Sequence, residues 1–292
     1  DVAEHAPFAR WLSFSENETV RDIGLSSSPV LAADNLQEYL WQCCGGAVLT
    51  SASLSALGKF DMLTMRTGLP VRTNYLSIPS PFEFANAATL AIPRMHCDPS
   101  DQDKHTDTIV NLLPGILGPK PAALMLFSSR RQMLDVMRLL PNEWRDLVLC
   151  QDDFQKIQLI KYHCALIDKG KGSIIFGLSS FAEGIDLPGK YCTHVLIAKI
   201  PFGVPNDPIE MTLSAWVEQQ GMNAFMTLAV PEAAFRLMQA SGRLLRSETD
   251  TGKITLFDER IVNKSYGKQI LDSLPPYRRE IFEDAVPLRS GN

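Results

Sequence analysis

Short, continuous apolar runs alternate with stretches of helical spacing through the second two thirds of the chain. The apolar runs predict buried strands, and the amphipathic stretches between them predict helices. The predicted strands are residues 122–127, 147–150, 173–178, 193–200 and 253–258. The predicted helices are residues 105–117, 130–140, 154–166 and 232–245. This alternation is typical of an α/β protein whose mostly parallel sheet carries helices on both faces.

The first third of the chain follows a less regular pattern. Residues 1–35 are polar and predict irregular structure, whereas residues 35–43 have helical spacing that ends at a pair of glycines. Residues 47–50 are a short apolar run that predicts a strand. A polar stretch over residues 68–81, with two prolines near its end, predicts a linker or domain boundary.

Composition indicates a globular protein and limits its electrostatics. The chain has 292 residues, of which 45% are hydrophobic and 21% charged, and its formal net charge is −5. Because the whole molecule is acidic, binding of nucleic acid requires a local basic groove. No apolar run approaches the roughly 20 residues of a membrane helix, and no signal peptide is recognisable. We therefore expect a soluble, cytoplasmic protein, and the missing initiator methionine suggests a piece of a longer one.

Cysteine usage argues against a metal centre. The six cysteines are scattered without C-x-x-C spacing, so a zinc or iron–sulfur site built from these residues alone is not expected. A disulfide framework is also unexpected in a chain of this size. His96, Cys97 and His105 stand apart from other ligands, and isolated residues of this kind are usually structural. We predict no metal site within the chain.

Residues 239–246, Q-A-S-G-R-L-L-R, carry the strongest functional signal in the chain. On a helix, residues three apart share a face, so Arg243 and Arg246 are predicted to point the same way. Two permanently charged guanidinium groups aimed at one spot suit the stabilisation of charge on a transferring γ-phosphate. The alternative is a surface helix with an ordinary basic edge, and the accompanying Gln239 and Gly242 weaken that alternative.

Serine pairs follow two of the predicted strands. Ser128 and Ser129 come after the first strand and precede Arg130, and Ser179 and Ser180 come after the third. In α/β sheets, ligands bind outside the carboxyl ends of the strands. Hydroxyl groups, backbone N–H groups and an arginine at a helix start contact nucleic-acid phosphates without reading the base sequence. The alternative for the first pair is simple helix capping.

Four segments in this order resemble motifs III, IV, V and VI of superfamily 2 helicases. The segments are T-S-A-S-L at 50–54, L-F-S-S-R at 126–130, G-L-S-S-F-A-E-G-I-D at 177–186, and residues 239–246. S-F-A-E-G-I-D-L-P-G and Q-x-x-G-R-x-x-R resemble most closely the iron–sulfur branch, the DinG and XPD family. Among its bacterial members the sequence is most similar to the DinG-like paralogues called YoaA. The first segment has serine where the family often has threonine, which keeps the hydroxyl.

Several family motifs are absent from this sequence. It contains no G-x-G-K-[ST] phosphate loop, no D-E-A-H and no four clustered cysteines. In the family these parts precede motif III, so the resemblance implies the C-terminal portion of a helicase. Residues 1–70 would end motor domain 1, residues 71–276 would form a RecA-like motor domain 2, and residues 277–292 would be a tail. The [4Fe-4S] cluster and the phosphate-loop lysine would lie on a missing N-terminal portion, leaving this chain inactive alone.

The resemblance also assigns residues to ATP with Mg²⁺, which the family binds between its two motor domains. Arg246 would be the arginine finger, Arg243 a second phosphate contact, and Gln239 a group that orients the attacking water. The implied ATP-binding residues are Glu183, Gly184, Asp186 and Gly242. For Asp186, a helix cap or turn is the structural alternative.

A second set of residues would hold the DNA strand and couple it to the nucleotide. The implied DNA contacts are Ser128, Ser129, Arg130, Ser179, Ser180, Ser80 and Phe82. Phe82 would touch a base or merely pack against its neighbours. Thr50 and Ser51 would couple nucleotide state to DNA grip. Asp258 and Arg260 are predicted to form a structural ion pair. The family moves 5′ to 3′ on single-stranded DNA, usually at damaged forks, so the resemblance implies a nucleoid-associated repair or replication enzyme.

The C-terminal segment leaves two alternatives open. Residues 277–284 are predicted to form a short charged helix that bears Tyr277, Arg278 and Phe282. An aromatic anchor with an arginine suits protein docking, and the resemblance to YoaA implies the chi subunit of the polymerase III clamp loader as the partner. The other alternative is a tail folded back on its own domain. A docking module without catalysis therefore remains the competing function, whereas a serine hydrolase is disfavoured because no G-x-S-x-G surrounds the serine pairs.

Overall fold

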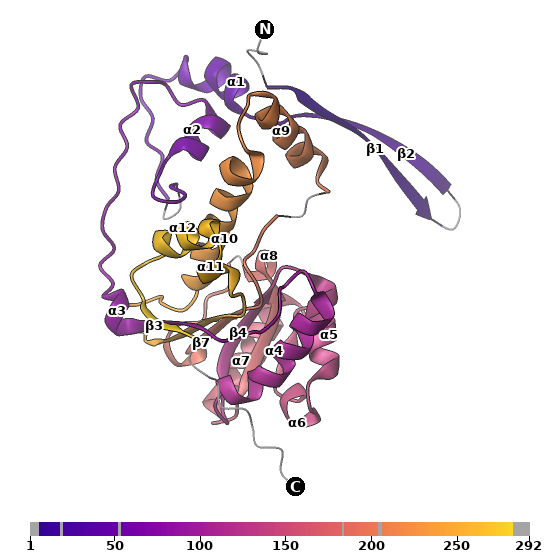
Figure 1. Cartoon of the computed structure of the whole chain (residues 1–292), viewed down its shortest axis with the longest axis vertical. Helices are drawn as coiled ribbons and strands as arrows, with labels where there is room; N and C mark the ends of the chain where they lie inside the picture. Colours follow the sequence, from indigo (N-terminus) through magenta and orange to yellow (C-terminus); the bar gives the residue numbers. More distant parts are fainter. Residues whose placement is uncertain (1–5, 18–19, 52–53, 183, 204–205, 283–292) are drawn as a thin grey trace. The chain divides into compact units, whose positions relative to one another are not determined.

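The computed structural model describes residues 6–17, 20–51, 54–182, 184–203 and 206–282. The chain divides into two compact units (Figure 1). The first comprises Asp1–Ile78 with Phe202–Phe235, and the second comprises Pro79–Pro201 with Arg236–Asn292.

A seven-stranded parallel sheet forms the centre of the second unit, with strand order β5-β6-β4-β7-β8-β3-β9. The strands are β3 (Ala88–Ile92), β4 (Ala122–Phe127), β5 (Val148–Cys150), β6 (Ser173–Leu178), β7 (His194–Ile197), β8 (Gly252–Leu256) and β9 (Arg278–Ile281). All six residues of β4 are buried, as expected for a central strand that is covered on both faces. The predicted α/β fold with a parallel sheet is confirmed.

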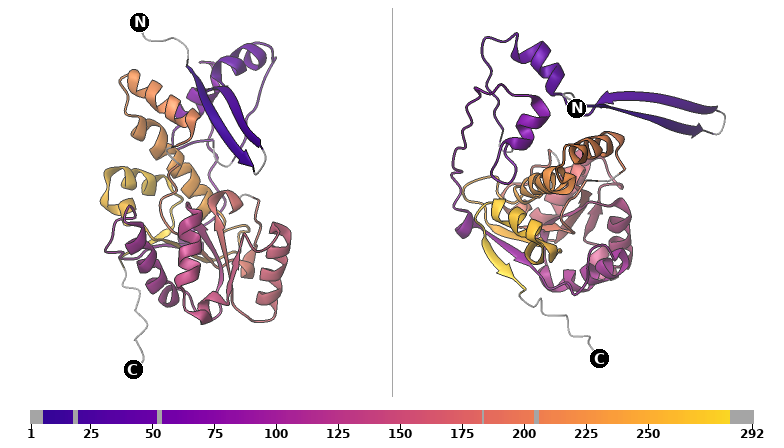
Figure 2. Two further views of the ribbon diagram at one scale, coloured as in Figure 1. Left: turned by 90° about the vertical axis from the view of Figure 1, so that its right-hand side faces the viewer. Right: turned by 45° about the horizontal axis from the view of Figure 1, so that its top comes forward.

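Helices connect these strands and cover the sheet (Figures 1 and 2). They are α3 (Phe84–Ala87), α4 (Gln102–Ile116), α5 (Arg130–Leu139), α6 (Asn142–Arg145), α7 (Lys156–Asp168), α8 (Ser179–Ala182), η2 (Gly189–Tyr191), α11 (Arg260–Asn263) and α12 (Ser265–Ser273). One core cluster joins Ile109 of α4 and Met133 of α5 to Phe127, Phe176 and Phe257, which belong to or follow three strands. This cluster therefore packs the ends of these strands against α4 and α5.

A buried histidine links the first long helix of this unit to the sheet. The Nε2 of His105 lies 2.7 Å from the carbonyl oxygen of Phe257, which can only accept, so Nε2 carries the proton. Its Nδ1 then accepts from Nε2 of Gln132, 2.8 Å away on α5. Burial lowers the pKa of His105 and keeps the ring neutral. This isolated histidine is structural, as its sequence context predicted.

The first unit begins with a long antiparallel hairpin of β1 (Phe8–Asn17) and β2 (Val20–Pro29), visible as a two-stranded ribbon in Figure 2. The prediction of irregular structure here was wrong. Ala9 is fully buried in a cluster with Leu213 and Val217 of α9 (Pro208–Gln219). Alternate residues on the opposite face are exposed. Because large apolar side chains such as Phe14 and Leu25 occupy the exposed positions, the sequence shows no alternation of buried apolar and exposed polar residues.

The remaining helical segments of the first unit are α1 (Ala33–Leu36), the π-helix η1 (Gln37–Trp41), α2 (Asp61–Thr67) and the π-helix η3 (Phe225–Ala229). The first two confirm the helix predicted over residues 35–43. The strand predicted over residues 47–50 was wrong: these residues are exposed and adopt no regular structure. A four-residue run needs a partner strand to satisfy its backbone, and the described residues supply none. No helix or strand is assigned from 68 to 83, as predicted for a linker.

Two further helix predictions need correction. Helix α10 (Val230–Ser241) ends four residues earlier than predicted, because the chain turns at Gly242. The helix predicted over residues 277–284 was wrong, since residues Arg278–Ile281 form β9 and pair in parallel with β3. The preceding pair of prolines stops α12, as expected. The charged pattern of the tail fits an edge strand, whose side chains face solvent.

Candidate functional site

The two serine pairs lie side by side at the carboxyl edge of the sheet. Strands β4 and β6 pair in parallel with Phe127 opposite Leu178, so Ser128 and Ser179 follow at neighbouring positions. The Ser179 hydroxyl donates to the carbonyl oxygen of Phe127 at 3.5 Å. Ser180 is exposed one residue further along α8. The structure therefore brings both predicted pairs to one place.

The members of the first pair have different surroundings. The Ser129 hydroxyl caps α5 by accepting from the backbone N–H of Gln132 at 3.3 Å, which confirms the capping alternative for this residue. The hydroxyl oxygen of Ser128 is buried and has no hydrogen-bond partner among the described residues. Arg130 opens α5 with a largely exposed side chain that pairs with Asp152 at 3.1 Å. Buried hydroxyls normally have partners, so Ser128 requires an explanation.

The loop after β6 is shaped by close packing. A Cβ atom on Gly177 would lie 2.6 Å from Cδ1 of Phe181, so only glycine leaves room for this ring. The ammonium group of Lys156 lies 5.2 Å from the centre of the same ring. Gly184 has a φ of +73°, a conformation that favours glycine. Glu183 lies outside the described residues. The packing of Phe181 thus fixes the start of this loop.

Arg243 and Arg246 converge on the next part of that loop. Nη1 of Arg243 donates to the carbonyl oxygen of Ile185 at 3.4 Å, and Nη2 of Arg246 donates to the same oxygen at 2.8 Å. Nε of Arg246 also lies 3.1 Å from a carboxylate oxygen of Asp186. The prediction that a helix aligns these arginines was wrong, because both follow the end of α10. A turn brings their guanidinium groups together instead.

The exposure of these groups suits a ligand site. The Arg246 side chain is 30% exposed and that of Asp186 is 73% exposed, whereas Ile185 and Leu187 are buried. The loop is therefore anchored by apolar side chains and presents a carboxylate beside a guanidinium group at the surface. Gly242 lies at the turn that precedes the arginines, and Gln239 is partly exposed on the last turn of α10.

Asp250 is a site residue that the sequence interpretation missed. Its carboxylate accepts from the backbone N–H of Arg246 at 2.8 Å and from that of Ser247 at 2.9 Å. It also accepts from the Ser247 hydroxyl at 2.6 Å. Asp250 is only 5% exposed. Burial raises its pKa, but these hydrogen bonds outweigh burial and lower the pKa overall. The S-x-x-D spacing was the available signal, because it resembles a helix cap.

The predicted ion pair between Asp258 and Arg260 is confirmed. The guanidinium group donates through Nε at 2.9 Å and through Nη2 at 2.8 Å to the two carboxylate oxygens. Asp258 is fully buried and also accepts from the backbone N–H of Ile200 at 2.9 Å. This pair joins the ends of β7 and β8, which is a structural role.

The other predicted DNA and coupling residues lie elsewhere. The hydroxyl of Ser80 accepts from the backbone N–H of Phe82 at 3.3 Å, and the Phe82 ring packs 5.8 Å from that of Phe84. This aromatic packing favours the structural alternative for Phe82. Thr50 and Ser51 are exposed in the first unit and are described only within it.

The C-terminal residues are incorporated into the second unit. Tyr277 is 5% exposed, packs edge-on against Phe84, and donates to the Ser241 hydroxyl at 3.4 Å. Arg278 donates to the Thr89 hydroxyl at 3.1 Å. The guanidinium group of Arg94 lies 4.8 Å from the ring centre of Phe282. These contacts match the folded-back alternative for residues 277–282.

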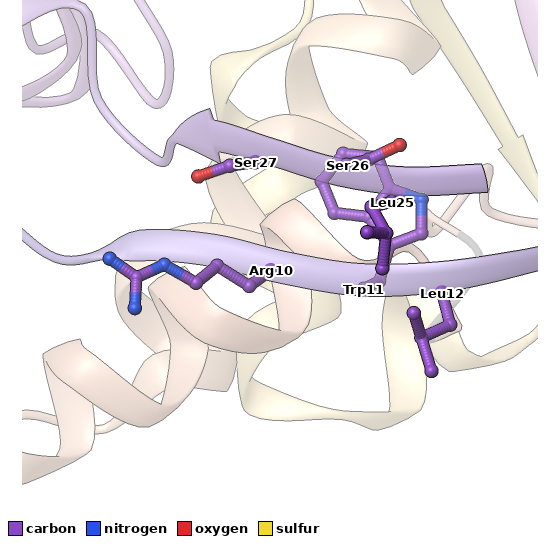
Figure 3. A pocket seen from close by; sticks show the side chains of 6 residues that line it. All are labelled: Arg10, Trp11, Leu12, Leu25, Ser26 and Ser27. Atoms are coloured by element: carbon purple, nitrogen blue, oxygen red, sulfur yellow. The ribbon is translucent and has the colours of Figure 1, made fainter.

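A pocket of about 380 Å³ lies on the hairpin of the first unit (Figure 3). It is lined by Arg10, Trp11, Leu12, Leu25, Ser26 and Ser27. Arg10 supplies its single charge among these six residues, and no helicase-like motif contributes to it. The pocket therefore gives no support to a catalytic role for the hairpin.

The described residues contain neither a cluster of metal ligands nor a membrane-spanning helix. No group of three or more histidine, cysteine, aspartate or glutamate side chains there is placed to hold a metal ion. The same part of the chain has no helix that is long and apolar enough to cross a membrane.

Comparison with known proteins identifies the family of this chain. Residues 118–277 match the family model described as the helicase C-terminal domain. An "ATP-dependent DNA helicase DinG" from Photobacterium profundum is 41% identical over 284 residues, which cover 94% of this chain and 40% of that protein. The protein of the same name from Escherichia coli K12 is 30% identical over 278 residues, covering 93% and 39%. The chain thus spans about two fifths of the length of these relatives.

Solved structures of XPD proteins share the fold. An apo XPD structure is 20% identical with a TM-score of 0.50, covering 66% of this chain and 39% of that one. Xpd4 of S. tokodaii is 14% identical with a TM-score of 0.51, covering 75% and 43%. The family match includes β4 to β8 and both arginines. The chain therefore belongs to the helicase C-terminal domain family and is homologous to the DinG helicases.

Proposed function

We propose that this chain is the C-terminal motor part of an ATP-dependent DNA helicase. The observation that carries the proposal is the convergence of Arg243 and Arg246 on the carbonyl oxygen of Ile185, beside the exposed carboxylate of Asp186. Two guanidinium groups fixed at one surface point are suited to stabilising the charge of a transferring phosphoryl group. The names of the homologous helicases support the same activity.

In this proposal Arg246 is the arginine finger and Arg243 supports it. The contacts to Ile185 and Asp186 hold the Arg246 guanidinium in one orientation before a nucleotide binds, which reduces the cost of ordering it. ATP with Mg²⁺ would supply the reactive γ-phosphate. Gln239 would orient the attacking water, and Gly184 and Gly242 would let backbone approach the nucleotide. Glu183 keeps the nucleotide-facing role that the family resemblance gives it.

DNA would run along the edge where Ser128, Ser129, Ser179 and Ser180 lie together. Their hydroxyls and the start of α5 with Arg130 offer hydrogen bonds to phosphates, which suits a motor that ignores base sequence. Ser80 and Phe82, which precede β3 and lie away from the serine pairs, remain proposed contacts of the DNA strand. Hydrolysis and product release would alternate the grip on the strand and move the motor.

The rest of the motor is proposed by homology. Residues 1–70 would end motor domain 1 and couple nucleotide state through Thr50 and Ser51, and residues 71–276 would form motor domain 2. The phosphate loop and a [4Fe-4S] cluster would lie on further parts of a longer protein. Movement from 5′ to 3′ on single-stranded or forked DNA, a role in repair, and a cytoplasmic, nucleoid-associated location complete the proposal.

The competing function is a docking module for a replication partner such as the chi subunit, with residues 277–292 as the docking tail. It has less support, because Tyr277 is buried against Phe84 and Ser241 rather than available as an anchor. Arg278 and Phe282 are also engaged within the unit. The nearer resemblance to YoaA, which suggested this partner, stays a prediction.

Strand displacement tests the helicase proposal. The full-length protein that carries this chain should displace the labelled strand of a forked DNA duplex with ATP, but not with a non-hydrolysable analogue. Arg246→Ala should abolish displacement while binding to the fork remains. Displacement that is equally fast without hydrolysis, or a wild-type protein that binds DNA but never separates it, would contradict the proposal.

A further inference from the structure

Four strands of the second unit end in one row of polar residues. Leu126 of β4 lies opposite Ile197 of β7, and the backbone N–H of Ala198 continues the pairing by donating to the carbonyl oxygen of Leu126 at 2.9 Å. Ile197 in turn lies opposite Leu256 of β8. Counting two residues onward from these paired positions places Ser128, Lys199 and Asp258 next to one another, with Ser179 on the far side of Ser128.

The row lies at the carboxyl edge of the sheet, just beyond the core that the helices α4 and α5 cover. Phe127, Ala198 and Phe257 belong to the core cluster that these two helices cover. Ser128, Lys199 and Asp258 follow these three buried residues directly, so the strand register places them side by side where the strands end.

Lys199 lies beside the carboxylate of Asp258, which already accepts hydrogen bonds from other groups. Both oxygens of Asp258 accept from Arg260, and one also accepts from the backbone N–H of Ile200. Within the ranges that the structure describes, the Lys199 ammonium group forms neither an ion pair nor a hydrogen bond. Burial and the neighbouring Arg260 lower its pKa, and Asp258 only partly offsets them. A half-buried ammonium group in this position gains free energy when an anion approaches.

Ser128 contributes a hydroxyl group to the same row. Its hydroxyl oxygen is buried without a partner, although buried hydroxyls in native proteins are normally hydrogen-bonded. It lies at the residue before the cap of α5, so the first N–H groups of that helix are close along the chain. A phosphate oxygen can accept from a hydroxyl, an ammonium group and helix N–H groups at once. The row therefore offers a set of donors that suits one tetrahedral anion.

We propose that Lys199 is a further DNA-binding residue that grips a backbone phosphodiester together with Ser128. The inference rests on the proposed function and names a contact that none of the helicase-like motifs contains. A DNA phosphate is favoured over a nucleotide phosphate because Lys199 flanks the serine edge. The arginines that would meet ATP instead follow α10 and contact the loop at Ile185.

The test is binding of fluorescein-labelled oligo-dT by the full-length protein over a series of salt concentrations. Lys199→Ala and Ser128→Ala should each weaken binding, the first by about tenfold. Lys199→Ala should also reduce the slope of log affinity against log salt by about 0.7, the value for one lost phosphate contact on a single strand. Lys199→Arg should restore most of the affinity because it keeps the charge.

Lys171→Ala is the matched control. It removes the same charge from an exposed lysine just before β6, at the amino edge of the sheet, and should leave binding unchanged. Thermal unfolding checks that each variant is folded. If Lys199→Ala kept the affinity and salt slope of wild type, the inference would be overturned but the proposed function would stand. The same holds if Lys199→Ala weakened the binding of ATP and left the binding of DNA intact. A wild-type protein that bound no oligo-dT would overturn the proposed function as well.

Discussion

Different residues hold the side chain and the backbone of Arg246. Ile185 and Asp186 contact its guanidinium group, whereas Asp250 accepts from its backbone N–H and from that of the next residue. Asp250 therefore acts on the site through the backbone turn that carries Arg246 and is a positioning residue. Because its carboxylate is buried, the hydrogen bonds cannot be replaced easily by water.

Replacing Asp250 by alanine should destabilise the fold in a pH-dependent way. The lowered pKa means that Asp250 stabilises the folded state above its unfolded pKa of about 3.9 and loses this effect as pH falls through the folded value. We expect Asp250→Ala to lose roughly 1–3 kcal/mol of unfolding free energy at pH 7. The difference from wild type should shrink below about pH 4.

Urea unfolding at a series of pH values measures this effect. Asp272→Ala, which removes an exposed carboxylate paired with Arg279, is the control and should change stability by less than about 0.5 kcal/mol. An Asp250→Ala protein as stable as this control at pH 7 would show that the buried carboxylate does not support the turn.

His194 should make the protein sensitive to mild acid. Its ring is buried, bonds the Thr255 hydroxyl at 2.8 Å, and has a pKa lowered to about 4 by burial and by Lys253. The unfolded chain binds the proton at about pH 6.5, so stability falls as pH drops from about 6.5 towards 4, by roughly 3 kcal/mol in total. His194→Gln, which does not titrate, should lose less stability between pH 7 and pH 5. Equal losses in urea unfolding would contradict this account.

At the scale of elements, the sequence pattern predicted the strands that are buried on both faces of the sheet, but not those that depend on a particular partner strand. Strands β4 and β6 were predicted to the residue, because fully buried parallel strands read as unbroken apolar runs. The hairpin was missed, since its exposed positions carry apolar side chains and its sequence does not alternate, and β9 was missed because an edge strand can carry charged residues. The run at 47–50 lacked a described strand to pair with. Tertiary pairing decided each of these cases, and local pattern does not record it.

The loop after β6 depends on one glycine. Gly177→Ala would place a methyl group 2.6 Å from the Phe181 ring, which must move and take the loop with it. We expect a loss of about 1–3 kcal/mol in unfolding free energy and weaker binding of single-stranded DNA. Gly118→Ala is the control, because nothing lies within 4 Å of its added methyl group. Unchanged stability and DNA affinity in the first variant would mean that Phe181 adjusts without moving the loop.

At the scale of the whole molecule, the chain is homologous to only part of the DinG helicases. The family match and the homologous helicases account for residues 118–277 and for the arginine pair. The sequence supplied both serine pairs and both arginines, because these residues stand in recognisable motifs. The sequence did not identify Asp250 or Lys199. The role of Asp250 depends on buried hydrogen bonds and that of Lys199 on strand register, and both arise only on folding.

The chain alone should not hydrolyse ATP at a helicase rate. It contains no phosphate-loop lysine, and an arginine finger has little to act on unless the nucleotide is held by such a loop. Phosphate release from purified chain should match the buffer blank, with and without oligo-dT. DNA-stimulated turnover by this chain would show that it carries a complete nucleotide site.

Single-turnover ATP hydrolysis by the full-length protein on single-stranded DNA tests the central claim most directly. Arg246→Ala should slow the chemical step by roughly 10³ or more, with DNA binding retained. Arg131→Ala, which removes an exposed arginine that pairs with Asp135 one helical turn along α5, should react as wild type does. A wild-type rate in Arg246→Ala would contradict the account. The two arginines would then have only a structural role, in holding the loop at Ile185.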